Sequence, residues 1–233
     1  MNIKSMTNYI IAFVISILLF PILLVTGVEL VAFDQTFYAR QYERLNTAQE
    51  IGMSDEDLNR VTLELTDYIR DKTDSLDHIT AVIDGAQRKV FNQREIAHMV
   101  DVKELFQFAG KVRNFSLIGV LILLISLFLL SRRKPLWYLA VSYLAASALL
   151  LLLLLIAVPV VQADFTYYWN QFHYLFFDND LWILNPATDI MIQMVPQPFF
   201  NKAVFRVITY FAAGVVLLGM GSILVLRSLR KRV

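Results

Sequence analysis

The chain has 233 residues, 57% of them apolar, and its mean hydropathy of +0.55 is too high for a soluble globular protein. The formal net charge of +1 conceals a strong asymmetry, because all 20 acidic residues fall within residues 29–104 and 164–189. The chain contains no cysteine, which excludes disulfides, a thiol nucleophile and thiolate metal sites. An acidic exterior also argues against nucleic acid as a partner.

Four uncharged blocks predict four transmembrane helices. They cover residues 5–28, 114–131, 135–163 and 207–226. Each block is near or above the ~20 residues that a helix needs to cross a ~30 Å hydrocarbon core. The first block is longer than the core of a signal peptide, and no small-x-small cleavage pattern follows it, so we expect a retained anchor.

Charges beside these blocks predict the orientation. Lys4, the run at 132–134 and the tail at 227–232 are basic and contain no acids, which is typical of the cytoplasmic side. Both termini should therefore be cytoplasmic, and the two long loops should lie outside. The expected segments are transmembrane helices at 8–33, 113–131, 136–162 and 203–226, a cap formed by 34–112 and 163–202, a cytoplasmic loop at 132–135 and a cytoplasmic tail at 227–233.

The first outer loop contains its own helix signals. Residues 34–50 have helical apolar spacing, and a second helix is predicted after Ser54, which can cap it ahead of three acids. Asn92 and Glu95 form a capping-box pattern for a helix at 93–110 that should run into the second span.

A small β-hairpin is predicted between those helices, within residues 79–91. β-branched residues flank Asp84-Gly85, a dipeptide that favours a tight hairpin turn. The predicted fold is therefore a mainly α membrane protein: a four-transmembrane-helix bundle with an extracytoplasmic cap of short helices and a small β-hairpin.

The second outer loop is short and rich in aromatic residues. Asn185-Pro186 predicts the start of a short helix, and Pro196 and Pro198 should end it before the fourth span.

His98 is the first candidate for chemistry. Asp101 lies three residues after it and Glu95 three before, so all three should share a helical face. A carboxylate beside an imidazole can hold one tautomer and stabilise the imidazolium, as a general base requires. Such pairs are also common on solvated helices, and the spacing alone favours that structural interpretation.

His173 lies among the rings of the second loop. An interfacial aromatic belt explains most of those rings but does not explain a histidine. His78 is predicted to be a solvated loop residue. A two-histidine, one-carboxylate metal site from His98, Asp101 and His173 is a competing possibility, but the spacing has no metal-site signature.

Charged residues at the ends of the spans are candidates for binding a polar head group. Glu29 ends the first uncharged block and Arg206 precedes the last, where a charge must reach water, pair or face a polar cavity. Arg40, Arg94 and Arg113 are further candidates for binding carbonyl or phosphate groups.

The run at 91–106, Phe-Asn-Gln-Arg-Glu-Ile-Ala-His-Met-Val-Asp-Val-Lys-Glu-Leu-Phe, resembles a signature of the lipoprotein intramolecular transacylase family of Gram-positive bacteria. The second loop at 172–182, with Asn185-Pro186, Asp189 and Pro196, is also similar, and so is the layout of spans. The resemblance covers nearly the whole chain.

This resemblance implies a multi-pass bacterial membrane enzyme whose partners are membrane lipids and a diacylglyceryl-modified lipoprotein. The enzyme would move the sn-2 acyl chain to the α-amino group of the N-terminal cysteine, giving a lyso-form lipoprotein. The catalytic histidines of the family correspond to His98 and His173, while the supporting roles of Asp101 and Glu95 rest on the helix-face argument. The candidate substrate-binding residues are Glu29, Tyr38, Arg40, Arg94, Tyr174, Trp182 and Arg206.

The reaction needs no cofactor and no metal, because converting an ester to an amide is energetically downhill. The alternative is a non-catalytic sensor or accessory protein whose cap binds a lipid or peptide. A transporter is disfavoured, since no span has a charge at its centre.

Overall fold

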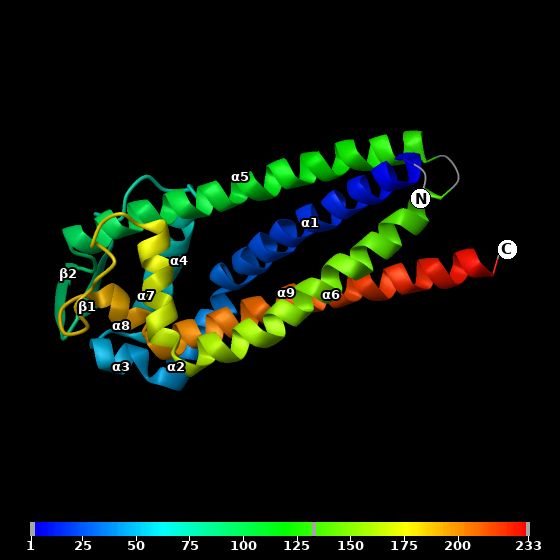
Figure 1. The fold of residues 1–233 in the computed structure, drawn as a ribbon. Helices are drawn as coiled ribbons and strands as arrows, with labels where there is room; N and C mark the ends of the chain where they lie inside the picture. The colour runs from blue at the N-terminus through cyan, green and yellow to red at the C-terminus, as the bar shows by residue number, and fades with distance from the viewer. Residues whose placement is uncertain (1–2, 132–133, 232–233) are drawn as a thin grey trace. The chain divides into compact units, whose positions relative to one another are not determined.

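The computed structural model describes residues 3–131 and 134–231, which are mainly helical with one small antiparallel sheet (Figure 1). The chain divides into two compact units. The membrane unit consists of Met1–Val28, Ala109–Asp164 and Val207–Val233, and the cap unit consists of Glu29–Phe108 and Phe165–Arg206. The predicted fold class, a bundle of four membrane helices with short helices and a β-hairpin, is confirmed.

Within the described residues, four helices are long and apolar enough to cross a membrane: α1 (Ile3–Ala32), α5 (Gln93–Leu130), α6 (Pro135–Ala163) and α9 (Gln197–Arg230). α5 has 38 residues and is therefore about 57 Å long, well beyond a hydrocarbon core of ~30 Å. Its uncharged stretch starts at residue 114, and its charged N-terminal part, up to Phe108, belongs to the cap unit.

The membrane unit has a narrow core and a broad apolar outer surface. Ala12 and Ile15 of α1 pack against Leu127 of α5, and all three are almost completely buried. By contrast, Leu155 and Leu217 are mostly exposed, as expected for helix surfaces that face lipid. The hydrophobic effect does not drive helices together within lipid. Close packing stabilises the bundle instead, and a small residue such as Ala12 allows two helices to approach closely.

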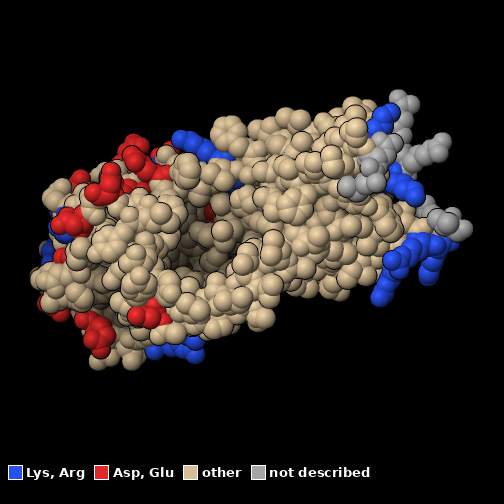
Figure 2. Space-filling model, in the orientation of Figure 1, with Lys and Arg blue, Asp and Glu red and all other residues tan. Residues whose placement is uncertain are grey.

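Charge is distributed unevenly over the surface (Figure 2). Basic side chains gather at the end of the membrane unit that carries both chain termini, whereas acidic side chains gather on the cap unit. Arg132 and Arg133, which contributed to the predicted orientation, lie outside the described residues.

The predicted helix at 34–50 is in fact two helices, α2 (Gln35–Leu45) and α3 (Thr47–Ile51). Asn46 separates them with a left-handed backbone (φ 52°), a conformation that asparagine tolerates better than most residues. The apolar spacing continues through this break, so the sequence pattern did not reveal it.

The next two predictions are confirmed. Ser54 caps α4 (Asp55–Ile69) by accepting a hydrogen bond from the Asp57 N–H at 3.1 Å. The hairpin pairs β1 (Thr80–Ile83) with β2 (Ala86–Lys89) in antiparallel register. Asp84 and Gly85 both have positive φ, as the tight turn requires.

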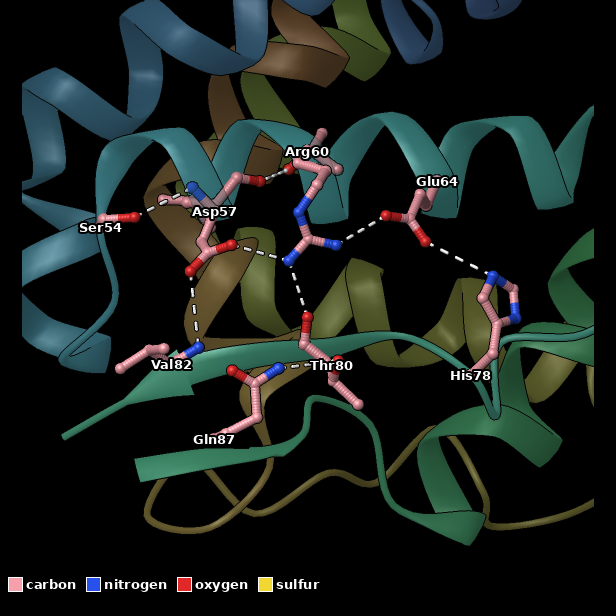
Figure 3. A network of polar contacts seen from close by, with 10 residues as sticks. Ser54, Asp57, Arg60, Glu64, His78, Thr80, Val82 and Gln87 are labelled. Atoms are coloured by element: carbon pink, nitrogen blue, oxygen red, sulfur yellow. Dashed lines mark hydrogen bonds and ion pairs between the residues drawn. The ribbon is translucent and has the colours of Figure 1, made fainter. Parts of the chain in front are cut away.

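A polar network joins α4 to this hairpin (Figure 3). The Arg60 guanidinium bridges Asp57 and Glu64, each at 2.7 Å, and donates to the Thr80 carbonyl at 2.7 Å. Asp57 in turn accepts from the Val82 N–H at 3.4 Å. The hairpin is therefore held to α4 by side-chain contacts to its backbone.

The second outer loop differs from expectation. Residues 165–176, for which the aromatic sequence predicts no particular element, form the helix α7 (Phe165–Phe176). The short helix α8 (Ile190–Met194) does not start at Asn185-Pro186, because Asn185 and Asp189 hydrogen-bond to each other and close a turn there. Pro198 does not end a helix but lies in the first turn of α9, where proline is tolerated.

Candidate acyl-transfer site

Two histidines meet within the cap unit. His98 comes from the charged N-terminal part of α5 and His173 from α7, and their ring centroids are 6.3 Å apart. Both side chains are buried, with 8% and 7% of their surface exposed. The structure therefore brings together the two histidines that are 75 residues apart in the chain (173 minus 98).

Aromatic rings form the walls around the pair. Phe177 contacts both imidazoles, with centroid distances of 5.5 Å to His98 and 5.6 Å to His173. Trp182 stacks on His173 at 4.6 Å, and Trp169 meets the same imidazole edge-on at 4.9 Å. The surroundings of the pair are therefore largely apolar and shielded from solvent, which strengthens any electrostatic interaction made inside them.

The two imidazoles differ in their hydrogen bonds. His173 Nδ1 lies 2.7 Å from the Trp169 carbonyl oxygen. A carbonyl can only accept, so Nδ1 carries the proton and Nε2 of the neutral ring keeps its lone pair. His98 Nδ1 is buried and has no hydrogen-bond partner among the described residues. An unpartnered buried polar atom is uncommon and is consistent with a group that awaits a substrate.

Both histidines are held neutral. Burial lowers the pKa of His98 to about 4, reinforced by repulsion from His173 and opposed by the nearby Asp101 carboxylate. Burial also lowers the pKa of His173, while its bond to the Trp169 carbonyl has the opposite, smaller effect. Repulsion between the rings disfavours a state in which both carry a charge.

Glu95 occupies a different position from the one its spacing suggested. Its carboxylate accepts from the Asn92 N–H at 2.7 Å and from the Met191 N–H at the start of α8, also at 2.7 Å. The Asn92 side chain accepts from the Glu95 N–H in return, so the predicted capping box is confirmed. Burial raises the pKa of Glu95 despite these bonds. Both of its oxygens bind backbone donors rather than an imidazole.

Asp101 and Arg94 hold the second loop against α5. Asp101 accepts from the Asn179 side chain at 2.9 Å, and Arg94 forms an ion pair with Asp180 at 3.3 Å. Arg94 also donates to the Asp180 carbonyl. Trp182 is tied to the same turn, since its indole N–H donates to the Asn179 carbonyl at 3.1 Å.

Some residues of this site were not predicted from the sequence. Trp169 and Phe177 lie four residues before and after His173, so they share its face once 165–176 is recognised as a helix. Asp189 accepts from the Asn92 side chain at 3.0 Å and joins the two outer loops. No local sequence pattern indicates a contact between residues so far apart.

The other candidate substrate-binding residues also belong to the cap unit. Arg206 pairs with Asp34 at 2.7 Å and lies over the Phe37 ring, Arg40 is exposed, and Glu29 is half-buried near the end of α1. Tyr174 contacts Trp182 at 5.1 Å. Burial raises the pKa of Tyr38 to about 12, which keeps its hydroxyl protonated.

A chain of ring contacts connects Tyr38 to the histidines. Tyr38 contacts Phe199 at 5.0 Å, Phe199 contacts Phe200 at 6.0 Å, and Phe200 contacts Trp169 at 4.4 Å. Trp169 then meets His173, so the candidate residues Tyr38 and His173 belong to one continuous aromatic cluster. Within residues 3–131 and 134–231, no three His, Asp or Glu side chains are grouped so as to hold a metal ion.

A family model described as lipoprotein intramolecular transacylase Lit matches residues 13–200. The chain belongs to this family. It is therefore an integral membrane acyltransferase that acts on lipoproteins, and the family resemblance of its sequence is confirmed. A non-catalytic accessory role is not favoured. No curated protein sequence matches the chain.

Solved structures of the transacylase Lit from Bacillus cereus share the fold. An in meso structure is 20% identical with a TM-score of 0.77, covering 97% of this chain and 99% of the other. A variant with one histidine replaced by arginine is 19% identical, with a TM-score of 0.76 and coverages of 99% and 96%. A variant with one histidine replaced by alanine is 19% identical, with a TM-score of 0.74 and coverages of 98% and 97%.

Proposed function

We propose that His98 and His173 are the acid–base pair of an intramolecular O-to-N acyl transfer on a diacylglyceryl-modified lipoprotein. The transfer moves the sn-2 acyl chain to the α-amino group of the N-terminal cysteine and leaves a lyso-form lipoprotein. The observation that carries this proposal is the buried histidine pair at 6.3 Å, walled by rings and differing in hydrogen bonding.

His173 is the general base in this proposal. Its Nδ1–H is committed to the Trp169 carbonyl, which leaves Nε2 as the acceptor for a proton from the substrate. The bond also fixes the ring orientation, as the partner of a catalytic histidine commonly does. The substrate amine is mostly protonated at neutral pH, because an α-amino group has a pKa of about 7.7–8.0. Removing that proton is the first requirement of the reaction.

His98 is the general acid. An imidazole with a pKa lowered to about 4 releases a proton readily once it has received one. The repulsion between the two rings favours a single proton shared by the pair, rather than one on each ring. The proton taken up from the attacking amine can therefore be returned to the leaving oxygen, which restores the pair to its starting state.

The bonds balance without a cofactor. The amine nitrogen attacks the sn-2 ester carbonyl, the new C–N bond forms, and the C–O bond to glycerol breaks. The substrate ammonium loses two protons on becoming the amide: one is released to solvent, and the other ends on the sn-2 oxygen as a hydroxyl. General acid–base catalysis is typically worth about 10²–10⁴-fold. Holding the amine against the ester can contribute far more, roughly 7–11 kcal/mol.

The ring walls support a second requirement, the exclusion of water. Water entering the site would hydrolyse the ester instead of allowing transfer to nitrogen. Phe177, Trp169 and Trp182 cover the two imidazoles and leave each less than one-tenth exposed. An enclosed aromatic site therefore favours transferase over hydrolase chemistry.

We further propose that the cap unit lies outside the cell and both termini inside, with the membrane-embedded parts near 8–33, 113–131, 136–162 and 203–226. Basic residues at the terminal end of the membrane unit support this orientation (Figure 2). The outer segments would then be 34–112 and 163–202, and the inner ones 132–135 and 227–233. The substrate and its surrounding lipids would meet the histidines at the outer leaflet.

Mass spectrometry of a lipopeptide labelled only in its sn-2 acyl chain tests the proposed reaction. After incubation with the purified protein in liposomes, the total mass should stay constant while fragmentation finds the label on the N-terminal nitrogen. A lipopeptide with an acetylated amine is the matched control and should not react. Label remaining on glycerol, or transfer of the unlabelled sn-1 chain, would contradict the proposal.

A further inference from the structure

Helix α7 has two contrasting faces. One face carries Trp169, His173 and the following Phe177, which surround the histidine pair. The other exposes large apolar side chains: Leu175 is 77% exposed, Tyr174 63% and Phe176 46%. The helix that holds the proposed base therefore presents an apolar surface on its outer side.

This outer face of α7 has no charged residue. None occurs from residue 165 to residue 177, although the cap unit as a whole is rich in acids. α4 shows the contrast, because its exposed Leu63 lies among Arg60, Glu64 and Asp67, all of which form ion pairs. Gln171 is the one amide exposed on this otherwise apolar face, and an uncharged, mainly apolar helix surface indicates a non-aqueous partner.

The chain itself indicates which partner. α6 ends at Ala163 and α7 starts at Phe165, so a single residue separates α7 from a membrane-spanning helix. Two Cα steps cover no more than about 7.6 Å, which places the start of α7 next to the end of a span. Tyrosine, tryptophan and phenylalanine are typical of helices at the level of the lipid head groups.

We propose that the outer face of α7 inserts into the lipid leaflet nearest the cap and so sets the depth of His173. Interfacial helices bury their apolar face ~5–10 Å into the boundary between head groups and acyl chains. A helix with its side chains is ~10–12 Å across, so the opposite face carrying His173 lies near the level of the glycerol esters. The insertion of α7 does not depend on the proposed function. Only the importance of the depth of His173 for acyl transfer rests on it.

The absence of cysteine allows a direct test in the full-length protein. Leu175→Cys and Phe176→Cys carry a nitroxide label on the outer face of α7, and Leu63→Cys, on the exposed side of α4, is the matched control. In liposomes, labels at 175 and 176 should collide more often with oxygen, which enriches in lipid, than with an aqueous nickel complex. The label at 63 should show the reverse order.

Two outcomes would overturn the inference. Labels at 175 and 176 that collide with nickel as often as the label at 63 would place the outer face in water. Labels shielded from both reagents would indicate a covering protein surface, such as a second copy of the chain. Acyl transfer is assayed with the same labelled samples and with the unlabelled wild-type protein. Absence of transfer by the wild-type protein would count against the histidine mechanism. A label exposed to water in an active sample would count against insertion alone.

Discussion

The cap unit places its histidines in two opposite environments. His78 is 60% exposed and lies 3.5 Å from the Glu64 carboxylate, within the polar network of Figure 3. His98 and His173 are buried among rings, and within the described residues neither imidazole hydrogen-bonds a carboxylate. A neighbouring acid therefore does not distinguish the candidate catalytic histidines from the solvated one.

Burial among rings distinguishes them instead. The same desolvation that lowers the pKa of both His98 and His173 keeps them neutral and ready to accept a proton. An exposed histidine beside a carboxylate gains only a weak, screened ion pair. The comparison predicts that substitutions at the aromatic site change activity or stability strongly, whereas substitutions in the polar network change them only slightly.

The largest effect should come from removing either buried imidazole. His98→Asn or His173→Asn should lower the rate of acyl transfer by about 10²–10⁴-fold, the usual contribution of general acid–base catalysis. His78→Asn is the matched control and should retain the wild-type rate. The rate is measured by mass spectrometry, and unfolding curves check that each variant is folded. Full activity of either buried-site variant would remove that histidine from the mechanism.

Glu95→Gln should destabilise the cap. The carboxylate accepts two backbone N–H groups, and the amide would present a donor to one of them. An unsatisfied buried group costs about 1–3 kcal/mol, which chemical denaturation in detergent can measure. Glu64→Gln, at an exposed ion pair, should cost under about 1 kcal/mol.

The activity of Glu95→Gln also separates two roles. If Glu95 only positions the helices, the variant should keep the wild-type shape of the pH profile with a lower maximum rate. A shifted acid limb would instead indicate that Glu95 takes part in proton transfer with His98.

The pH dependence should report the lowered pKa values. The attacking group is the free amine, so the rate should rise with pH through the amine pKa of about 8 and level off above it. The separate acid limb caused by protonation of the histidines should lie below the ordinary histidine pKa of about 6.5, because burial lowers the pKa of both rings. An acid limb at about 6.5 would show that the catalytic histidine is not buried in the reacting enzyme.

Stability should change with pH in the same window. The unfolded chain takes up protons on its histidines at about pH 6.5, whereas the folded protein does so only at lower pH. The unfolded state therefore binds more protons between these values, and the free energy of unfolding should fall as the pH drops through them. His98→Asn should reduce this fall, as chemical denaturation at several pH values can show.

The smallest effect should come from the polar network. Arg60→Met removes two exposed ion pairs and one bond to the Thr80 carbonyl, which water can replace. We expect a loss of stability of up to about 1 kcal/mol and no change in the rate of acyl transfer. Faster hydrogen exchange confined to the hairpin would accompany it, whereas a slower transfer rate would show that the two regions are coupled.

Sequence signals succeeded where the interacting residues are close in the chain. The Ser54 cap, the Asp84-Gly85 turn and the Asn92–Glu95 capping box each involve residues within a few positions of one another. The long uncharged blocks likewise predicted the spans from composition alone. In each of these cases, local chemistry determines local structure.

The predictions failed where tertiary contacts compete with local ones. Spacing places Glu95 on the same side of α5 as His98, but the N–H of Met191, far along the chain, binds its carboxylate. The turn between Asn185 and Asp189 shifts the start of α8 to Ile190. The sequence does not predict α7, because its aromatic residues do not follow a simple apolar–polar period. The meeting of His98 and His173 could not be derived from spacing, and it was expected only from the family resemblance.

The bond from Met191 to Glu95 has a consequence for how this family can vary. Because the donor is a main-chain amide, every amino acid except proline supplies it at position 191, and only packing in that buried place restricts the choice further. Position 95 has no such freedom. A shorter side chain cannot reach the Met191 N–H, and the amide of glutamine would present its own N–H group to one of the two backbone N–H donors. The sequence around position 191 in the second outer loop can therefore vary, because the glutamate at position 95 keeps that part of the loop bound to α5.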